Sequence, residues 1–132
     1  TLIELLVVIA IIGILSAVVL ASLNTARAKG SNAAVKSNLQ GIRSQAEIIY
    51  DNTQDYTGIC ADQNIINAID AAILAGSDTG ATVATRCNAS ATEWAVNVKL
   101  KVQDSGNDWW CTDQTGIAKG EPAELGGATT CS

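Results

Sequence analysis

The sequence predicts an α+β fold in which a long N-terminal helix leads into a small head that contains an antiparallel hairpin. Residues 1–51 keep a helical pattern without a break. Residues 92–112 combine one strictly alternating stretch, a turn and a second short apolar stretch. Four cysteines, all in the head, indicate a small loop-rich domain held by disulfides.

The first element is an apolar segment over residues 1–23. No charged side chain occurs from Leu5 to Leu23, and a helix of that length measures about 28 Å, close to the roughly 30 Å of a hydrocarbon core. The segment is therefore predicted to be a membrane-length helix. A cleavable signal peptide is disfavoured, because its apolar stretch would be shorter and preceded by basic residues.

The next segment, residues 24–51, is predicted to continue the same helix. Its apolar residues are spaced four, three, four and three apart and form one stripe: Val35, Leu39, Ile42, Ala46 and Ile49. We therefore expect one helix of about fifty residues, apolar all round in its first half and amphipathic in its second.

The head comprises residues 52–132. Residues 62–75 have helical spacing and end at a glycine, and residues 92–102 place apolar side chains on alternate positions. A turn cluster at 104–107 then leads into a second strand at 109–112, so a hairpin is expected. Residues 113–132 are rich in glycine and predicted to be mostly irregular, with room for one short strand.

Composition excludes several classes of function. The chain has 132 residues with 48% hydrophobic and 16% charged side chains, which excludes a large multi-step enzyme and a disordered chain. Its net charge of −5 argues against nucleic-acid binding as the main task. Histidine is absent and no nucleophile or carboxylate pair has a base beside it, so we expect neither enzymatic activity nor a cofactor.

The cysteines favour two disulfides over a zinc site, because no two are closely spaced and no histidine is present. Three pairings are possible. We favour Cys60 with Cys87 and Cys111 with Cys131, since each bridge is then local. Disulfides place the head in an oxidising space outside the cytoplasm.

Orientation in the membrane has one conflicting signal. Arg27 and Lys29 directly follow the apolar segment, and the positive-inside rule alone would put that end in the cytoplasm. We expect the head to lie outside the cytoplasm, as the cysteines indicate, and we expect residues ahead of Thr1 to carry the stronger positive charge that sets the orientation.

The amino terminus carries the most specific motif. Glu4 is an acidic residue at the edge of an apolar stretch, where a carboxylate is costly without a cationic partner. The run TLIELLVVIAIIGIL, residues 1–15, closely resembles the N-terminal signature of type IV pilins and pseudopilins. In that family a prepilin peptidase removes a short basic leader, and the mature chain begins with an N-methylated Phe. The resemblance implies that such a residue precedes Thr1 and that the leader holds the basic charge in the cytoplasm.

The resemblance implies a fold and an assembly site. The fold is the type IV pilin fold, in which the long helix packs on a small antiparallel sheet and a disulfide, here Cys111 with Cys131, closes the C-terminal loop. Glu4 would meet the N-terminal amine of a neighbouring subunit, with Thr1 and Gly13 as further assembly residues. A helix-dipole role for Glu4 is the alternative. The filament core would comprise Leu2, Ile3, Leu5, Leu6, Val7, Val8, Ile9, Ile11, Ile12, Ile14 and Leu15.

The sequence departs from the family pattern at Ala21, where many relatives carry a proline that bends or melts the helix. We therefore expect the helix to be continuous, or only briefly melted, between Gly13 and Val19.

By resemblance, the chain is expected to be a structural subunit of a type IV pilus, most simply the major pilin. Its partners would be further copies of itself, the prepilin peptidase, the pilus assembly machinery and, before assembly, the cytoplasmic membrane, which it would cross once with its head outside. Adhesion and motility are the uses typical of such a surface filament. Two alternatives remain open: a pseudopilin of a type II secretion or DNA-uptake system, and a monomeric membrane-anchored receptor.

The head has two further candidate features, a group of aspartates and a pair of tryptophans. Asp104, Asp108 and Asp113 are weak calcium candidates, but a solvated turn is favoured and no metal is expected. Trp109 and Trp110 are adjacent, so on a strand they face opposite ways; we expect one in the core and one at a subunit interface.

Overall fold

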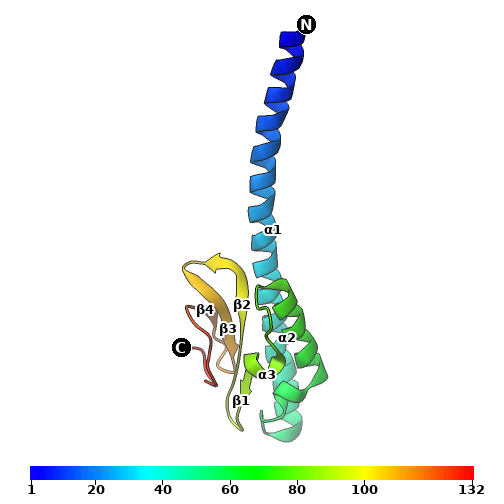
Figure 1. Ribbon diagram of the computed structural model, residues 1–132. Coiled ribbons are helices and arrows are strands. Elements are labelled where there is room, and N and C mark those ends of the chain that lie inside the picture. Colours follow the sequence, from blue (N-terminus) through cyan, green and yellow to red (C-terminus); the bar gives the residue numbers. More distant parts are fainter.

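In the computed structural model, which describes all 132 residues, one long helix carries the head on its C-terminal half (Figure 1). This helix, α1 (Leu2–Thr53), has 52 residues. Its first half projects away from everything else, and its second half lies along the head. The boundary between the two halves falls where the sequence changes from apolar all round to amphipathic.

The projecting half is an unbroken helix. Helical hydrogen bonding continues through Gly13 and Val19 without interruption, so the predicted continuity is confirmed. The helix ends at Gln54, which adopts a left-handed conformation with φ 56° while its N–H bonds to the Tyr50 carbonyl at 2.7 Å. The predicted end at residue 51 is therefore two residues short.

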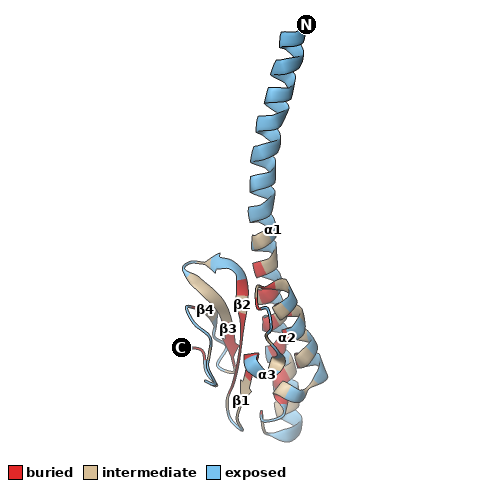
Figure 2. Ribbon diagram, viewed as in Figure 1, coloured by how far each residue is buried: buried red, intermediate tan, exposed pale blue.

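The second half of α1 buries the predicted stripe. Val35, Leu39, Ile42 and Ala46 are at most 1% exposed, and Ile49 is half-buried against the same cluster. Figure 2 shows burial beginning only where α1 reaches the head. The head is thus built around this helix and is not an appendage to it.

Three further helical segments and a four-stranded antiparallel sheet complete the head. The helices are η1 (Ile59–Ala61), α2 (Gln63–Ala75) and α3 (Val83–Arg86). The strands pair in the order β1 (Cys87–Ala89), β2 (Trp94–Asp104), β3 (Asn107–Asp113) and β4 (Ala118–Glu121). The predicted α+β architecture, a long helix packed on a small antiparallel sheet, is confirmed.

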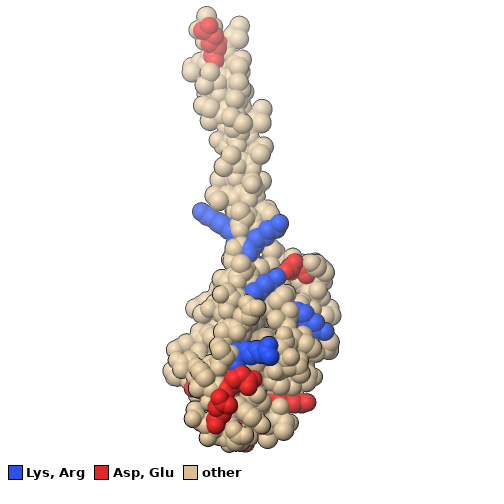
Figure 3. Space-filling model, turned by 180° about the vertical axis from the view of Figure 1, so that it is seen from behind, with Lys and Arg blue, Asp and Glu red and all other residues tan.

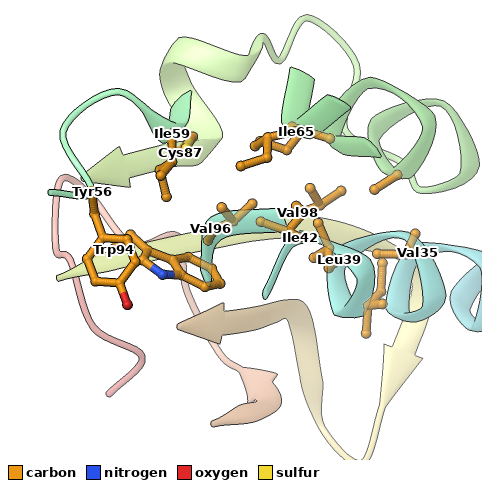
Figure 4. Close-up of a cluster of buried hydrophobic side chains, with 14 residues drawn as sticks. Val35, Leu39, Ile42, Tyr56, Ile59, Ile65, Cys87, Trp94, Val96 and Val98 are labelled. Carbon is orange, nitrogen blue, oxygen red and sulfur yellow. The ribbon is translucent and has the colours of Figure 1, made fainter. Parts of the chain in front are cut away.

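Helix α1 packs against α2 and against the inner face of the sheet. Apolar side chains of α1, α2 and β2 converge there to form the main core (Figure 4). On β2 the alternate residues Trp94, Val96, Val98 and Leu100 are at most 3% exposed. The alternation that predicted the strand therefore marks the face that packs on α1.

The outer face of the sheet is covered by the C-terminal segment. The Cys111–Cys131 disulfide joins that segment to β3, and the carboxylate of Asp113 accepts a hydrogen bond from the Cys131 N–H at 3.0 Å. A second disulfide, Cys60–Cys87, joins η1 to β1. Both favoured pairings are confirmed.

Candidate assembly surface

The largest feature without a partner in the chain is the apolar surface of α1 over residues 2–23. Its large apolar side chains are 42% to 79% exposed, and α1 is long and apolar enough to cross a membrane. Because apolar side chains point in every direction around the axis, one contact face is not enough. This cylinder requires an apolar environment on all sides, either lipid or other helices.

Glu4 and Thr1 form a capping box at the start of α1. The Thr1 backbone nitrogen donates to the Glu4 carboxylate at 2.5 Å, and the Glu4 N–H donates to the Thr1 hydroxyl at 3.4 Å. Both side chains are more than three-quarters exposed, and Oε1 of Glu4 accepts no hydrogen bond within the chain. In the isolated chain, Oε2 of Glu4 therefore accepts a hydrogen bond and Oε1 stays free for a partner. This arrangement is compatible with both expected roles of Glu4, the interaction with the helix dipole and the contact with a neighbouring subunit.

The remaining predicted assembly residue is Gly13. It lies in the middle of the projecting helix, and beyond its chain neighbours and the backbone of its own helix no atom comes within 4 Å of the position a Cβ would occupy. Within one chain nothing demands a glycine there. Its neighbours on the helix belong to the predicted filament core, and all of them are exposed.

The calcium candidates do not form a site. Asp104 lies beside the hairpin turn and pairs with Lys36, whereas Asp113 is buried at the other end of β3. Asp113 accepts hydrogen bonds from the turn that follows β3, including the Thr115 N–H at 3.0 Å. No group of three or more metal-ligating side chains occurs in the chain. These carboxylates organise turns and ion pairs.

The two tryptophans face opposite sides of the sheet. Trp110 packs on the main core, which confirms its half of the prediction, and the Lys36 ammonium lies 4.1 Å from its ring centroid. Trp109 is half-buried on the outer face, with the Arg86 guanidinium 4.7 Å from its ring centroid. An intersubunit role for Trp109 remains a prediction.

Sequence reasoning missed a buried ion pair that holds the loop after α2. Arg86, 8% exposed, donates to both Asp78 oxygens, at 2.5 Å from Nε and 2.8 Å from Nη2, and also to Glu124. Burial disfavours the guanidinium charge, but these hydrogen bonds outweigh it, so the pKa of Arg86 lies above its ordinary value. No spacing in the sequence connects these residues, because the loop and the C-terminal segment meet only in the folded head.

Asn32 is a second residue that the pattern did not reveal. It lies on the buried side of α1, 7% exposed, and its side chain bonds to the backbone of β2. The amide nitrogen donates to the Val102 carbonyl at 2.8 Å, and the amide oxygen accepts from the Lys101 N–H at 2.9 Å. Asn32 therefore fixes the end of β2 to the point where α1 enters the head.

Comparison of the chain with protein-family models, with curated proteins and with solved structures gave no match.

Proposed function

We propose that this chain is a structural subunit, most simply the major pilin, of a type IV pilus, and that it polymerises through α1. One observation carries the proposal: residues 2–23 of α1 are apolar on every side and bear a single carboxylate, Glu4, in the first turn of the helix. The resemblance of residues 1–15 to the pilin signature supports the same reading. Storage in a membrane and repacking in a helical bundle each provide the apolar surroundings that this surface needs.

The energetics favour the bundle as the source of cohesion. Full burial of a large aliphatic side chain contributes roughly 1.5–3 kcal/mol, and α1 offers such side chains at 15 of the 22 positions from Leu2 to Leu23. Exposed polar contacts between heads contribute at most about 1 kcal/mol each. Cohesion between subunits is therefore assigned to the helices, and surface chemistry to the heads.

Glu4 gives the assembly its direction. A carboxylate transferred into an apolar bundle is costly unless a cation accompanies it. The N-terminal amine of the next subunit supplies that cation only if copies are displaced along the axis. Such a contact joins two different surfaces, so it does not close on itself and builds an open helical polymer.

The experiment compares surface fibres from cells that produce the native chain, Glu4→Leu or Glu4→Asp, with Ile3→Leu as the matched neutral control. Fibres are sheared, counted by electron microscopy and identified by mass spectrometry. We expect fibres made of this chain, beginning with a methylated Phe before Thr1, in native and Ile3→Leu cells. Glu4→Leu should abolish fibres while the membrane level of the chain stays unchanged.

Three results would contradict the proposal. Normal fibres from Glu4→Leu would remove the role of the carboxylate. A chain that stays in the membrane and is never found in fibres would favour the anchored receptor, in which the Thr1 contact suffices for Glu4. Short fibres that require a secretion or DNA-uptake apparatus would instead identify a pseudopilin.

A further inference from the structure

We propose that, while α1 is held in a membrane, the head docks onto anionic phospholipid headgroups through the end that faces the apolar segment. We call this surface the near end of the head and define it by Arg27, Lys29, Leu74, Lys101 and Val102. The proposal goes beyond polymerisation, because it requires only that residues 1–23 span the bilayer.

The length of α1 places the near end at the membrane surface. The apolar segment ends at Leu23, and Ala28 is the first residue of α1 that the head covers. Five residues of helix span about 7.5 Å, and each headgroup layer is about 5 to 8 Å thick. The head therefore begins where the headgroups end, and contact between them follows from the geometry.

The charges of the near end suit an anionic surface. Arg27, Lys29 and Lys101 are exposed, and none has an ion-pair partner within the chain. The whole chain carries a net charge of −5, so anionic lipids would repel a head whose charges were evenly spread. Figure 3 shows basic side chains where the stem meets the head, with one acidic group beside a basic one just below them, whereas most of the acidic side chains in this view lie toward the opposite end of the head. This asymmetry turns the attractive charges toward the bilayer.

The near end also presents apolar side chains. Leu74, the one leucine of α2, is 85% exposed, and Val102 at the end of β2 is 42% exposed. Leu74 and Lys101 line one cleft of about 540 Å³, so an apolar and a basic side chain lie together. The hydrogen bonds of Asn32 to Lys101 and Val102 fix this part of β2 beside α1. Apolar anchors among basic residues are typical of surfaces that bind the lipid interface.

A second cleft, of about 320 Å³, lies between α1 and the end of β2. It is lined by Lys29 and Lys36, together with the Lys36 partner Asp104. Arg27 and Lys29 are two residues apart on α1 and so project from roughly opposite sides of the helix. The basic side chains of the near end are therefore distributed around the helix and are not confined to one flank. A distribution of this kind fits a planar surface that the helix crosses.

A second copy of the chain is the competing occupant. The acidic residues of α1 are Glu4, 23 residues before Arg27, and Glu47 and Asp51, at least 20 residues beyond it, so a copy would have to be shifted by at least about 30 Å to bring acidic and basic groups of the two helices together. Charge alone permits that contact. It gives no role to Leu74 and Val102, whose exposed apolar surface the lipid interface covers.

The test uses the full chain in nanodiscs that contain spin-labelled lipid headgroups and either phosphatidylglycerol or phosphatidylcholine. Paramagnetic broadening is read from the methyl groups of Leu74 and of Ile48. Ile48 is 55% exposed and serves as the internal control, because it lies about 36 Å along α1 from Asn24. We expect Leu74 to broaden in phosphatidylglycerol, to recover in phosphatidylcholine or in roughly 1 M salt, and Ile48 to remain sharp throughout.

Matched variants test the role of charge. Lys101→Gln should reduce the ratio of docked to free heads about fivefold, whereas Lys119→Gln, which changes a lysine on β4, should leave it unchanged. Equal broadening in both lipids, or none in either, would overturn the proposal. Broadening that depends on the number of chains per nanodisc and not on lipid charge would assign the near end to a second copy, which also overturns it.

Discussion

The contact between Asn32 and β2 makes a quantitative prediction about the stability of the head. Asn32→Ala removes three hydrogen bonds: one to the Val102 carbonyl at 2.8 Å and two from the N–H groups of Lys101 and Val102, at 2.9 and 3.3 Å. Each contributes about 1 kcal/mol net. Alanine recovers about 0.5 kcal/mol through its higher helix propensity, so we expect a net loss of about 2.5 kcal/mol.

The assay is thermal unfolding of the full chain in nanodiscs, followed by near-ultraviolet circular dichroism of the tryptophans. For a head of this size, a loss of about 2.5 kcal/mol lowers Tm by roughly 15 °C. Asn38→Ala is the matched control, because Asn38 lies half-buried on the same helix and its side chain makes no hydrogen bond. Its Tm should stay equal or rise slightly. Equal shifts for the two variants would refute the reasoning, since propensity and not the bridge to β2 would then explain the effect.

Two further predictions concern charged groups of the head. Arg86→Met should destabilise the head by about 3 kcal/mol, because the 5% exposed Asp78 loses its cation. Adding Asp78→Asn should recover part of that loss. An unchanged urea midpoint for Arg86→Met alone would contradict the role of this ion pair. The hydrogen bond and charge of Lys36 hold the pKa of Asp104 below its ordinary 3.8, so the pair stabilises the head above about pH 4 and is lost as pH falls through the lowered pKa. The Tm difference between native and Asp104→Asn chains should therefore narrow in acid, and a gap that stays constant down to pH about 2 would show that Asp104 does not titrate in this way.

The long helix and its two environments could be predicted from the sequence because they depend on local pattern. An uncharged stretch of membrane length and a stripe at helical spacing each have one simple structural meaning, and both are confirmed. The alternation that starts at Trp94 was equally clear, although β2 continues to Asp104. The strand β4 (Ala118–Glu121) occupies the place left open for one short strand.

Other parts of the head depend on contacts between distant segments. Strand β1 (Cys87–Ala89) has only three residues and no alternation to read; it exists because it pairs with the start of β2 and is tied by a disulfide to η1. The partners of Arg86 likewise come from a loop and from the C-terminal segment. The sequence pattern therefore predicts elements that depend on local spacing, and it misses elements that depend on contacts between segments distant in the sequence.

The candidate assembly surface likewise has features that the sequence predicts and features that depend on contacts in space. Its apolar extent and the position of Glu4 are visible in the sequence. The capping contact with Thr1, which gives the Glu4 carboxylate a partner in the isolated chain, is visible only in the structure. What the carboxylate contacts in an assembly is decided by a second copy, so it remains a prediction.

The central claim is that α1 becomes the interior of a helical filament, and helical reconstruction of sheared native fibres by electron cryomicroscopy tests it most directly. The account predicts that residues 2–23 of each copy lie at the fibre axis, covered on all sides by neighbouring helices, with the Glu4 carboxylate beside the N-terminal amine of the next subunit. A fibre in which this chain contributes only its head, or in which Glu4 faces solvent, would contradict it.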